Sequence, residues 1–338
     1  MAKFTNIKND DQKPLMVDVE NVAVLIDCTN EHQKGLYLSD ARQGRTQSLN
    51  GESWGVDGDS IADNIRKAGI EFIKMPFYWG KKDYGHYYVN PAAVDVISVS
   101  KTFIKPDDGS EYVTLLAGTQ RGDTVETSYV PLETATELVD AIKRVNPNMV
   151  EISSDMASTS FVQGGFTLLD TSQIISVHPN LTSELHVSFT SNSSVSLRVV
   201  EFDAINKDKN EYLNRLFNRL RGDRPVEDLI KDLGGDMNVL IPRLYRREEL
   251  YAKRLVDKFA AAVLDNVDGL VKIDNTKGTY YARPDQISSF YIAGDTAIQV
   301  NFNKLAKEQY APDLQIHYAD GDDALKGMKK LVALTQKP

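Results

Sequence analysis

The stretch YYVNPAAVDVISV (Tyr87–Val99) decides the predicted fold, because a near copy of it, YYARPDQISSFYI (Tyr280–Ile292), occurs 193 residues later. Each copy places two tyrosines and a proline before a run of residues that fit a pleated, half-buried surface. Proline presets the turn between the two strands. Tyr87 and Tyr88 are expected on opposite faces of the first strand, so that at most one of them faces the core.

The residues after each copy predict the same series of elements. The first copy continues into two further strands, separated by the turns PDDG and RGD, and then into a helix. The apolar residues of that helix have the i, i+3, i+4, i+7 spacing of one helix face: Leu138, Ala141, Ile142 and Val145. The second copy predicts four strands and a closing helix, whose apolar face holds Leu325, Met328, Leu331 and Val332.

Two fainter copies of this series extend the repeat over most of the chain. One of them closes with DGDSIADNIRKAG, in which Asp59 or Ser60 is the expected N-cap and Gly69 the expected C′ glycine. The predicted fold class is α+β, with four ββββα units at about 13–70, 85–146, 163–222 and 279–334. We expect these units to pair into two antiparallel-sheet domains, at residues 1–150 and 151–338.

Residues 223–278 interrupt the repeat before its last unit and predict a helical insertion. Its apolar residues fall roughly on one helix face: Leu244, Leu250, Leu255, Phe259 and Val263. Basic residues lie on or beside the other face: Arg243, Arg246, Arg247, Lys253 and Arg254. This pattern is typical of a solvated face, and it also allows phosphate binding or, through helix 243–264, self-association or a protein partner.

Composition bounds the function. The chain has 338 residues and a net charge of −9, which argues against nucleic-acid binding over its whole surface. Residues 205–260 differ from the rest, with 13 basic against 10 acidic side chains. The single cysteine, the lack of an apolar run of about 18 residues and the lack of a signal sequence predict an intracellular protein with no membrane span.

The repeated ββββα series resembles the Whirly and Pur-type folds that bind single-stranded nucleic acid. In those families two such units interleave, each supplying a curved antiparallel sheet. The resemblance is one of topology and covers most of the chain. The lysine- and glycine-rich strand motif of plant Whirly proteins is not found, so no binding residue is transferred from the family.

Aromatic rings interleaved with basic residues are the physical signature of single-strand binding. The strongest such stretch is FIKMPFYWGKKDYGHYY (Phe72–Tyr88), whose candidate contacts are Lys74, Phe77, Tyr78, Trp79, Lys81 and Lys82. A second set on one strand is Lys101, Phe103 and Lys105, and the insertion adds Arg243, Arg246 and Arg247. The alternative for Phe72–Tyr88 is a linker whose aromatic rings pack between two units.

Catalytic and metal-binding motifs are missing from the sequence, so we expect neither a catalytic residue nor a cofactor or metal. The loops DGDS (Asp57–Ser60) and DGDD (Asp320–Asp323) each precede a predicted helix and are interpreted as caps. Cys28 lies on a predicted strand as a small buried residue. His178 and His186 are too isolated to suggest a site.

The leading hypothesis is therefore a non-enzymatic protein that binds single-stranded RNA or DNA through its sheets. The alternative is a viral or phage structural or assembly protein whose repeats mediate protein–protein contacts.

Overall fold

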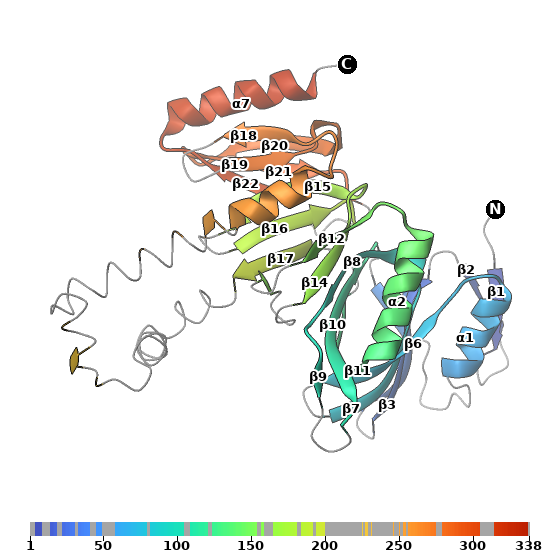
Figure 1. The fold of residues 1–338 in the computed structure, drawn as a ribbon. Coiled ribbons are helices and arrows are strands. Elements are labelled where there is room, and N and C mark those ends of the chain that lie inside the picture. The colour runs from blue at the N-terminus through green and yellow to red at the C-terminus, as the bar shows by residue number, and fades with distance from the viewer. Residues whose placement is uncertain are drawn as a thin grey trace.

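The computed structural model confirms the α+β class, with antiparallel sheets throughout the part it describes (Figure 1). It describes single positions between 225 and 254 and residues 4–8, 14–18, 22–30, 33–40, 45–48, 58–79, 82–104, 109–120, 124–153, 157–158, 165–180, 184–191, 194–199, 256–274, 279–304 and 314–336.

Each repeat unit contains a β-hairpin followed by a three-stranded meander, and a helix closes the unit wherever that part is described. The first unit contains β1 (Phe4–Lys8), β2 (Pro14–Asp18), β3 (Val22–Asn30), β4 (Gln33–Asp40), β5 (Arg45–Ser48) and α1 (Gly58–Lys67). The second contains β6 (Ile73–Trp79), β7 (Lys82–Val89), the 3-10 turn η2 (Pro91–Ala93), β8 (Val94–Val99), β9 (Phe103–Ile104), β10 (Glu111–Thr119), β11 (Thr124–Pro131) and α2 (Leu132–Val145).

The other two units repeat this order. The third contains β12 (Met149–Ser153), β13 (Ala157–Ser158), β14 (Phe166–Asp170), β15 (Ile174–Asn180), β16 (Glu184–Phe189) and β17 (Ser194–Val199). The fourth contains β18 (Val271–Asp274), β19 (Thr279–Ala282), η3 (Pro284–Gln286), β20 (Ile287–Ala293), β21 (Ala297–Phe302), β22 (Leu314–His317) and α7 (Gly321–Thr335). The helix expected before residue 222 lies outside the described residues.

The predicted unit is therefore one strand too short. Its expected first strand, at Tyr87, is the second strand of a hairpin, and β6 lies in the stretch that the alternative interpretation made a linker. Pro76, in the middle of β6, weakens the strand signal there, because proline is rare in regular strands. β6 tolerates it as the outermost strand of its own sheet.

The hairpin of each unit completes the sheet of the unit before it. We call the first meander strands (β3, β8, β15 and β20) host strands, and the second hairpin strands (β2, β7, β14 and β19) guest strands. Guest β7 pairs with host β3, β14 with β8, and β19 with β15, all antiparallel. The sheet around β8 thus contains strands from both sides of residue 150, and the division into domains at that residue stays a prediction.

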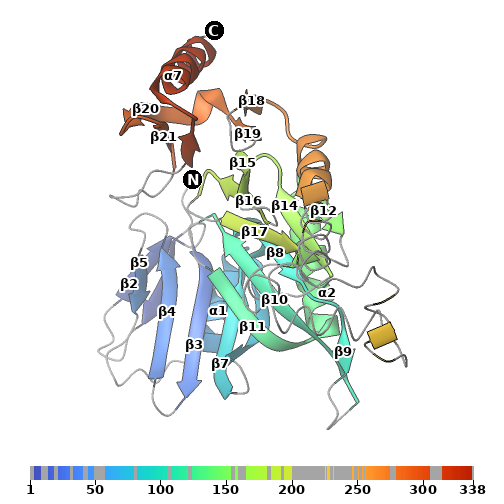
Figure 2. The same ribbon diagram turned by 90° about the vertical axis from the view of Figure 1, so that its left-hand side faces the viewer.

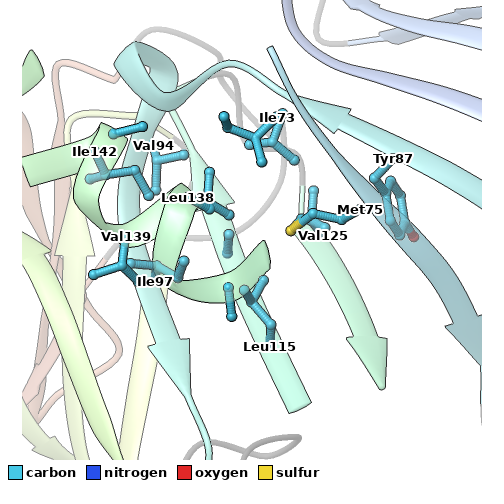
Figure 3. Close-up of a cluster of buried hydrophobic side chains, with 14 of the residues drawn as sticks. Ile73, Met75, Tyr87, Val94, Ile97, Leu115, Val125, Leu138, Val139 and Ile142 are labelled. Carbon is cyan, nitrogen blue, oxygen red and sulfur yellow. The ribbon is translucent and has the colours of Figure 1, made fainter. Parts of the chain in front are cut away.

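Helix α2 packs between the sheet of β3, β6 and β7 and the sheet of β8, β10 and β11. Leu138, Val139 and Ile142 point from α2 toward Ile97 and the other residues of this core (Figure 3). Helix α1 covers the opposite face of the first sheet through Ile61, Ile65 and other apolar residues. The part of the first sheet formed by β3, β6 and β7 is therefore buried on both faces. Tyr87 (5% exposed) and Tyr88 (0%) both face cores, and the expectation that only one would do so is wrong.

The buried face of α7 also differs from the prediction. Leu331 is buried and Met328 partly buried, but Leu325 is 50% exposed and Val332 lies at the surface. Ala324 and Gly327 face the sheet instead. A Cβ added to Gly327 would lie 2.2 Å from the hydroxyl oxygen of Tyr318. The absence of a side chain at Gly327 therefore lets α7 pack closely against Tyr318.

The helix caps are partly as predicted. Asp320 caps α7, its carboxylate accepting the Asp323 N–H at 2.9 Å. At α1 the expected caps Asp59 and Ser60 are wrong, because both lie inside the helix, and Asp57 lies outside the described residues. The Gly58 N–H donates instead to Asp27 of β3, 31 residues earlier. Gly69 has the left-handed φ of 89° that a C′ glycine requires, which confirms that prediction.

In the insertion, residues 256–264 are helical, and Phe259 and Val263 pack on the sheet of β15, β16 and β17. Leu250, expected on the same apolar face, is 51% exposed, so that expectation is wrong. Leu244 and Leu255 lie outside the described residues.

Candidate nucleic-acid interface

The candidate interface forms where two sheets meet along the edges of β6 and β11. Thr127 of β11 is fully buried at this seam. Its hydroxyl donates to the carbonyl of Pro76 at 2.7 Å and accepts the N–H of Tyr78 at 3.1 Å. One side chain of β11 thus bonds to two backbone groups of β6.

Replacing Thr127 with valine is expected to lower the free energy of unfolding by about 2 kcal/mol, because it leaves those two half-buried backbone groups without this partner. Urea denaturation measures this change. Thr136→Val on the exposed face of α2 is the matched control, and its cost is expected to stay within about 0.5 kcal/mol. Equal losses in the two variants would show that the seam bonds contribute nothing.

Four aromatic rings gather at this seam, and each is half-buried. Tyr129 of β11 lies at the centre, with its ring centroid 5.9 Å from Tyr78, 5.7 Å from Phe103 and 6.2 Å from Tyr112. The three contacts are edge-to-face, the favoured geometry for aromatic pairs. We call these four residues the four-ring cluster.

Tyr129, the central residue of the cluster, lies in a β-bulge of β11. The register between β10 and β11 shifts between Val113 and Leu115, which leaves Ser128 and Tyr129 opposite one residue. Tyr129 has φ = 55°, the only positive value at a non-glycine residue in the described chain. Such a conformation costs on the order of 1 kcal/mol and clusters at functional sites.

The cluster brings together residues from two stretches in which aromatic and basic residues interleave. Tyr78 comes from Phe72–Tyr88 and Phe103 from the second set, and both lie in the cluster. Tyr112 and Tyr129 were missed: a single tyrosine on an ordinary strand carries no signal, and the bulge depends on pairing with β10. Lys82 and Lys101, both exposed, lie close to cluster residues in the chain.

Two of the predicted contact residues are committed to interactions within the protein. Phe77 packs into the core beside Tyr84 and Tyr87, with ring centroids 5.3 and 4.4 Å away. Lys74 forms an ion pair with Asp59 at 2.8 Å and lies over the ring of Tyr88. This lysine bond holds the pKa of Asp59 below its usual value. Phe77 is therefore corrected from a contact residue to a core residue. Lys74 keeps an exposed side chain in its ion pair, so its role as a contact residue stays a prediction.

The structure places the remaining candidates less fully. Arg246 is exposed, far along the chain from the cluster. Trp79 ends β6, but its side chain lies outside the described part, as do the following residues altogether: Lys81, Lys105, Arg243 and Arg247.

His178 and His186 are not isolated, contrary to the sequence interpretation. They lie opposite each other on β15 and β16, with ring centroids 5.0 Å apart. His178 stacks on Tyr280, and the Nδ1 of His186 lies 3.0 Å from the Ser196 hydroxyl. Burial, followed by the neighbouring His186, lowers the pKa of His178 to about 3. Burial also lowers the pKa of His186.

In the described chain, no three histidine, cysteine or carboxylate side chains converge as metal ligands would. None of the described helices combines the length and apolarity needed to span a membrane. Burial, and to a lesser degree Asp27, raises the pKa of the Cys28 thiol, which disfavours the reactive thiolate.

Comparison of the chain with models of known protein families, with curated proteins and with solved structures finds no match. The resemblance to Whirly and Pur-type folds therefore stays a prediction.

Proposed function

We propose that this protein is a non-enzymatic binding protein that engages single-stranded nucleic acid at the four-ring cluster. The observation that supports this proposal is the convergence of four half-buried rings at one seam, two of them from the stretches that the aromatic–basic pattern indicates. Bases stack on such rings with about 1–3 kcal/mol each and with little sequence preference.

The charges around the cluster indicate that stacking supplies most of the binding free energy. Lys82 and Lys101 are exposed, but so are Asp83, which follows Lys82 on β7, and Glu111, the first residue of β10. Two lysines that neutralise two phosphates give a salt dependence of only about −1.4 in log K against log salt. A shallow salt dependence is thus expected, in keeping with the net charge of −9.

Phe103→Ala is expected to weaken binding of oligo(U) or oligo(dT) about 5- to 100-fold, because it removes one stacking ring. Fluorescence anisotropy with labelled oligonucleotides at several salt concentrations measures the change. Phe103→Tyr keeps the ring and is the matched control, expected to bind within about twofold of the natural chain. Absence of binding by the natural chain at low salt, or equal affinity of both variants, would overturn the proposal.

Assembly through protein–protein contacts is a second candidate function. The observation that favours it is that successive units share sheets. Each of three units adds a strand to the sheet of the unit before it, so strand addition already joins the units within this chain. Residues 256–264 of the predicted partner helix pack on their own chain, so sheet edges are the better supported contact surface.

A further inference from the structure

Among the described residues, the last host strand, β20, has no guest strand, whereas the other three host strands each have one. Within the described chain, β20 pairs with β21 alone, and the sheet ends there as β20-β21-β22. Figure 2 shows this last sheet at the far end of the molecule from β3 and β4. An unpaired strand edge offers a row of backbone donors and acceptors to another strand.

The burial of β20 also differs from that of a host strand that has a guest. All six residues of β8 are buried, and so are Pro91 and Ala93 of the preceding turn. The corresponding turn η3 has no buried residue, and β20 includes Tyr291 at 50% exposure. β20 thus exposes the positions that its counterparts cover.

A shared irregularity shows that β20 is built as a host strand. A register shift lies near the start of each host strand: between Val22 and Leu25, Val94 and Val96, Ile174 and Ser176, and Ile287 and Ser289. Moreover, β20 (ISSFYIA) contains no charged residue and no proline, the features that commonly protect an exposed edge from pairing.

The first hairpin is the complementary element, because no host strand pairs with its guest strand in the part of the chain that the structure describes. In the described chain β1 and β2 pair only with each other. β1 contacts α1 as β6 contacts α2, so β2 corresponds to β7, which pairs with a host. The described part of one chain therefore contains both a guest strand and a host strand that have no partner strand of the other kind.

The three existing junctions fix the register. The pairs are Val24 with Val89, Val96 with Leu169, and Ser176 with Ala282. In each pair the guest residue precedes its own host strand by five positions, as Val89 precedes Val94. The same spacing before Val22 selects Val17 of β2, and the host position equivalent to Val96 and Ser176 in β20 is Ser289.

We propose that β2 of one copy of this chain adds to β20 of a second copy, antiparallel, with Val17 opposite Ser289. The contact is β-strand addition between copies. Because it joins two different surfaces, it is head-to-tail and continues into rings or open filaments. This inference rests on the assembly candidate and is independent of nucleic-acid binding.

Disulfide trapping tests the register directly. Val17→Cys and Ser289→Cys are made in separate full-length chains, each with Cys28→Ser, and the chains are mixed under mild oxidation. Directly opposite strand residues lie within the Cα separation that a disulfide allows, so a covalent heterodimer is expected. The matched control is Thr5→Cys with Ser289→Cys, because Thr5 lies opposite Val17 on β1, one strand further away, and is too distant to link.

Sedimentation velocity of the natural chain supplies the second measurement, with average mass expected to rise with concentration. Equal cross-linking in the test and control mixtures would overturn the proposed register, and a natural chain that stays monomeric throughout would overturn the assembly candidate itself. Oligo(U) binding is measured on the same samples. Binding by either the trapped dimer or the monomer would support the nucleic-acid proposal, whatever the result for assembly. A chain that carries both Val17→Cys and Ser289→Cys is the last sample. If it forms only an intramolecular disulfide, β2 reaches β20 within one molecule, which would contradict pairing with a second copy.

Discussion

Lowering the pH from 7 to 4 is expected to reduce the free energy of unfolding by about 3 kcal/mol through His178 alone. Its pKa lies near 3 in the folded chain because burial beside His186 disfavours the imidazolium. In the unfolded chain an ordinary histidine has a pKa of about 6.5. Between these two values the unfolded state binds more protons, so stability falls as the pH falls.

The fall begins near pH 6.5 and ends near pH 3, with a slope that approaches about 1.4 kcal/mol per pH unit. His186 adds to it in the same direction, since burial lowers its pKa more than the neighbouring Glu184 raises it. Urea denaturation at half-unit steps of pH gives the curve. Carboxylates also titrate below pH 5, so the decisive quantity is a difference between two chains.

His178→Phe provides that difference, because phenylalanine keeps a ring beside Tyr280 and carries no titrating group. The variant is expected to lose about 3 kcal/mol less than the natural chain between pH 7 and pH 4. It also removes the buried Nδ1 of His178, which has no hydrogen-bond partner in the described chain. Parallel curves for the two chains would show that His178 does not carry the acid sensitivity.

The repeated motif predicted the parts of the fold that depend on local sequence. The prolines of YYVNP and YYARP start the turns η2 and η3, and the residues after them form β8 and β20. What the motif could not show is that the chain changes sheet at that turn. Tyr87 belongs to one sheet and Val94 to the next, because each guest strand pairs with a strand more than 50 residues away. Burial of Tyr87 and Tyr88 on opposite faces follows from that exchange.

The candidate site could be predicted only in part, for a related reason. Alternation of aromatic and basic residues selected Tyr78 and Phe103, and both lie in the four-ring cluster. The same pattern indicated Phe77 and Lys74, whose side chains have other partners. Phe77 packs against a hydrophobic core, and Lys74 pairs with Asp59 of α1. Neighbouring strand residues point to opposite faces, and the face that stays exposed is set by partners distant in sequence.

Replacing Gly165 with alanine is expected to cost roughly 4 kcal/mol, the largest effect of a single methyl group that we predict. Gly165 has φ = 83°, a conformation that costs alanine on the order of 1 kcal/mol. Its added Cβ would also lie 2.0 Å from the carbonyl oxygen of Val99 and 2.7 Å from the carbonyl carbon of Ser100. Both are backbone atoms at the end of β8, so no side-chain rotation relieves the contact.

The consequence reaches beyond one turn, because Gly165 precedes the guest strand β14, whose first residue, Phe166, pairs with Val99. Moving the backbone away loosens the junction between the second and third units. Gly269→Ala separates this contact from backbone strain: Gly269 has φ = 81°, but no described atom lies within 4 Å of its added Cβ. Its cost is expected to be about 1 kcal/mol. Since both variants carry the same backbone strain, the difference of roughly 3 kcal/mol in urea denaturation measures the close approach of β14 to β8, and equal costs would contradict it.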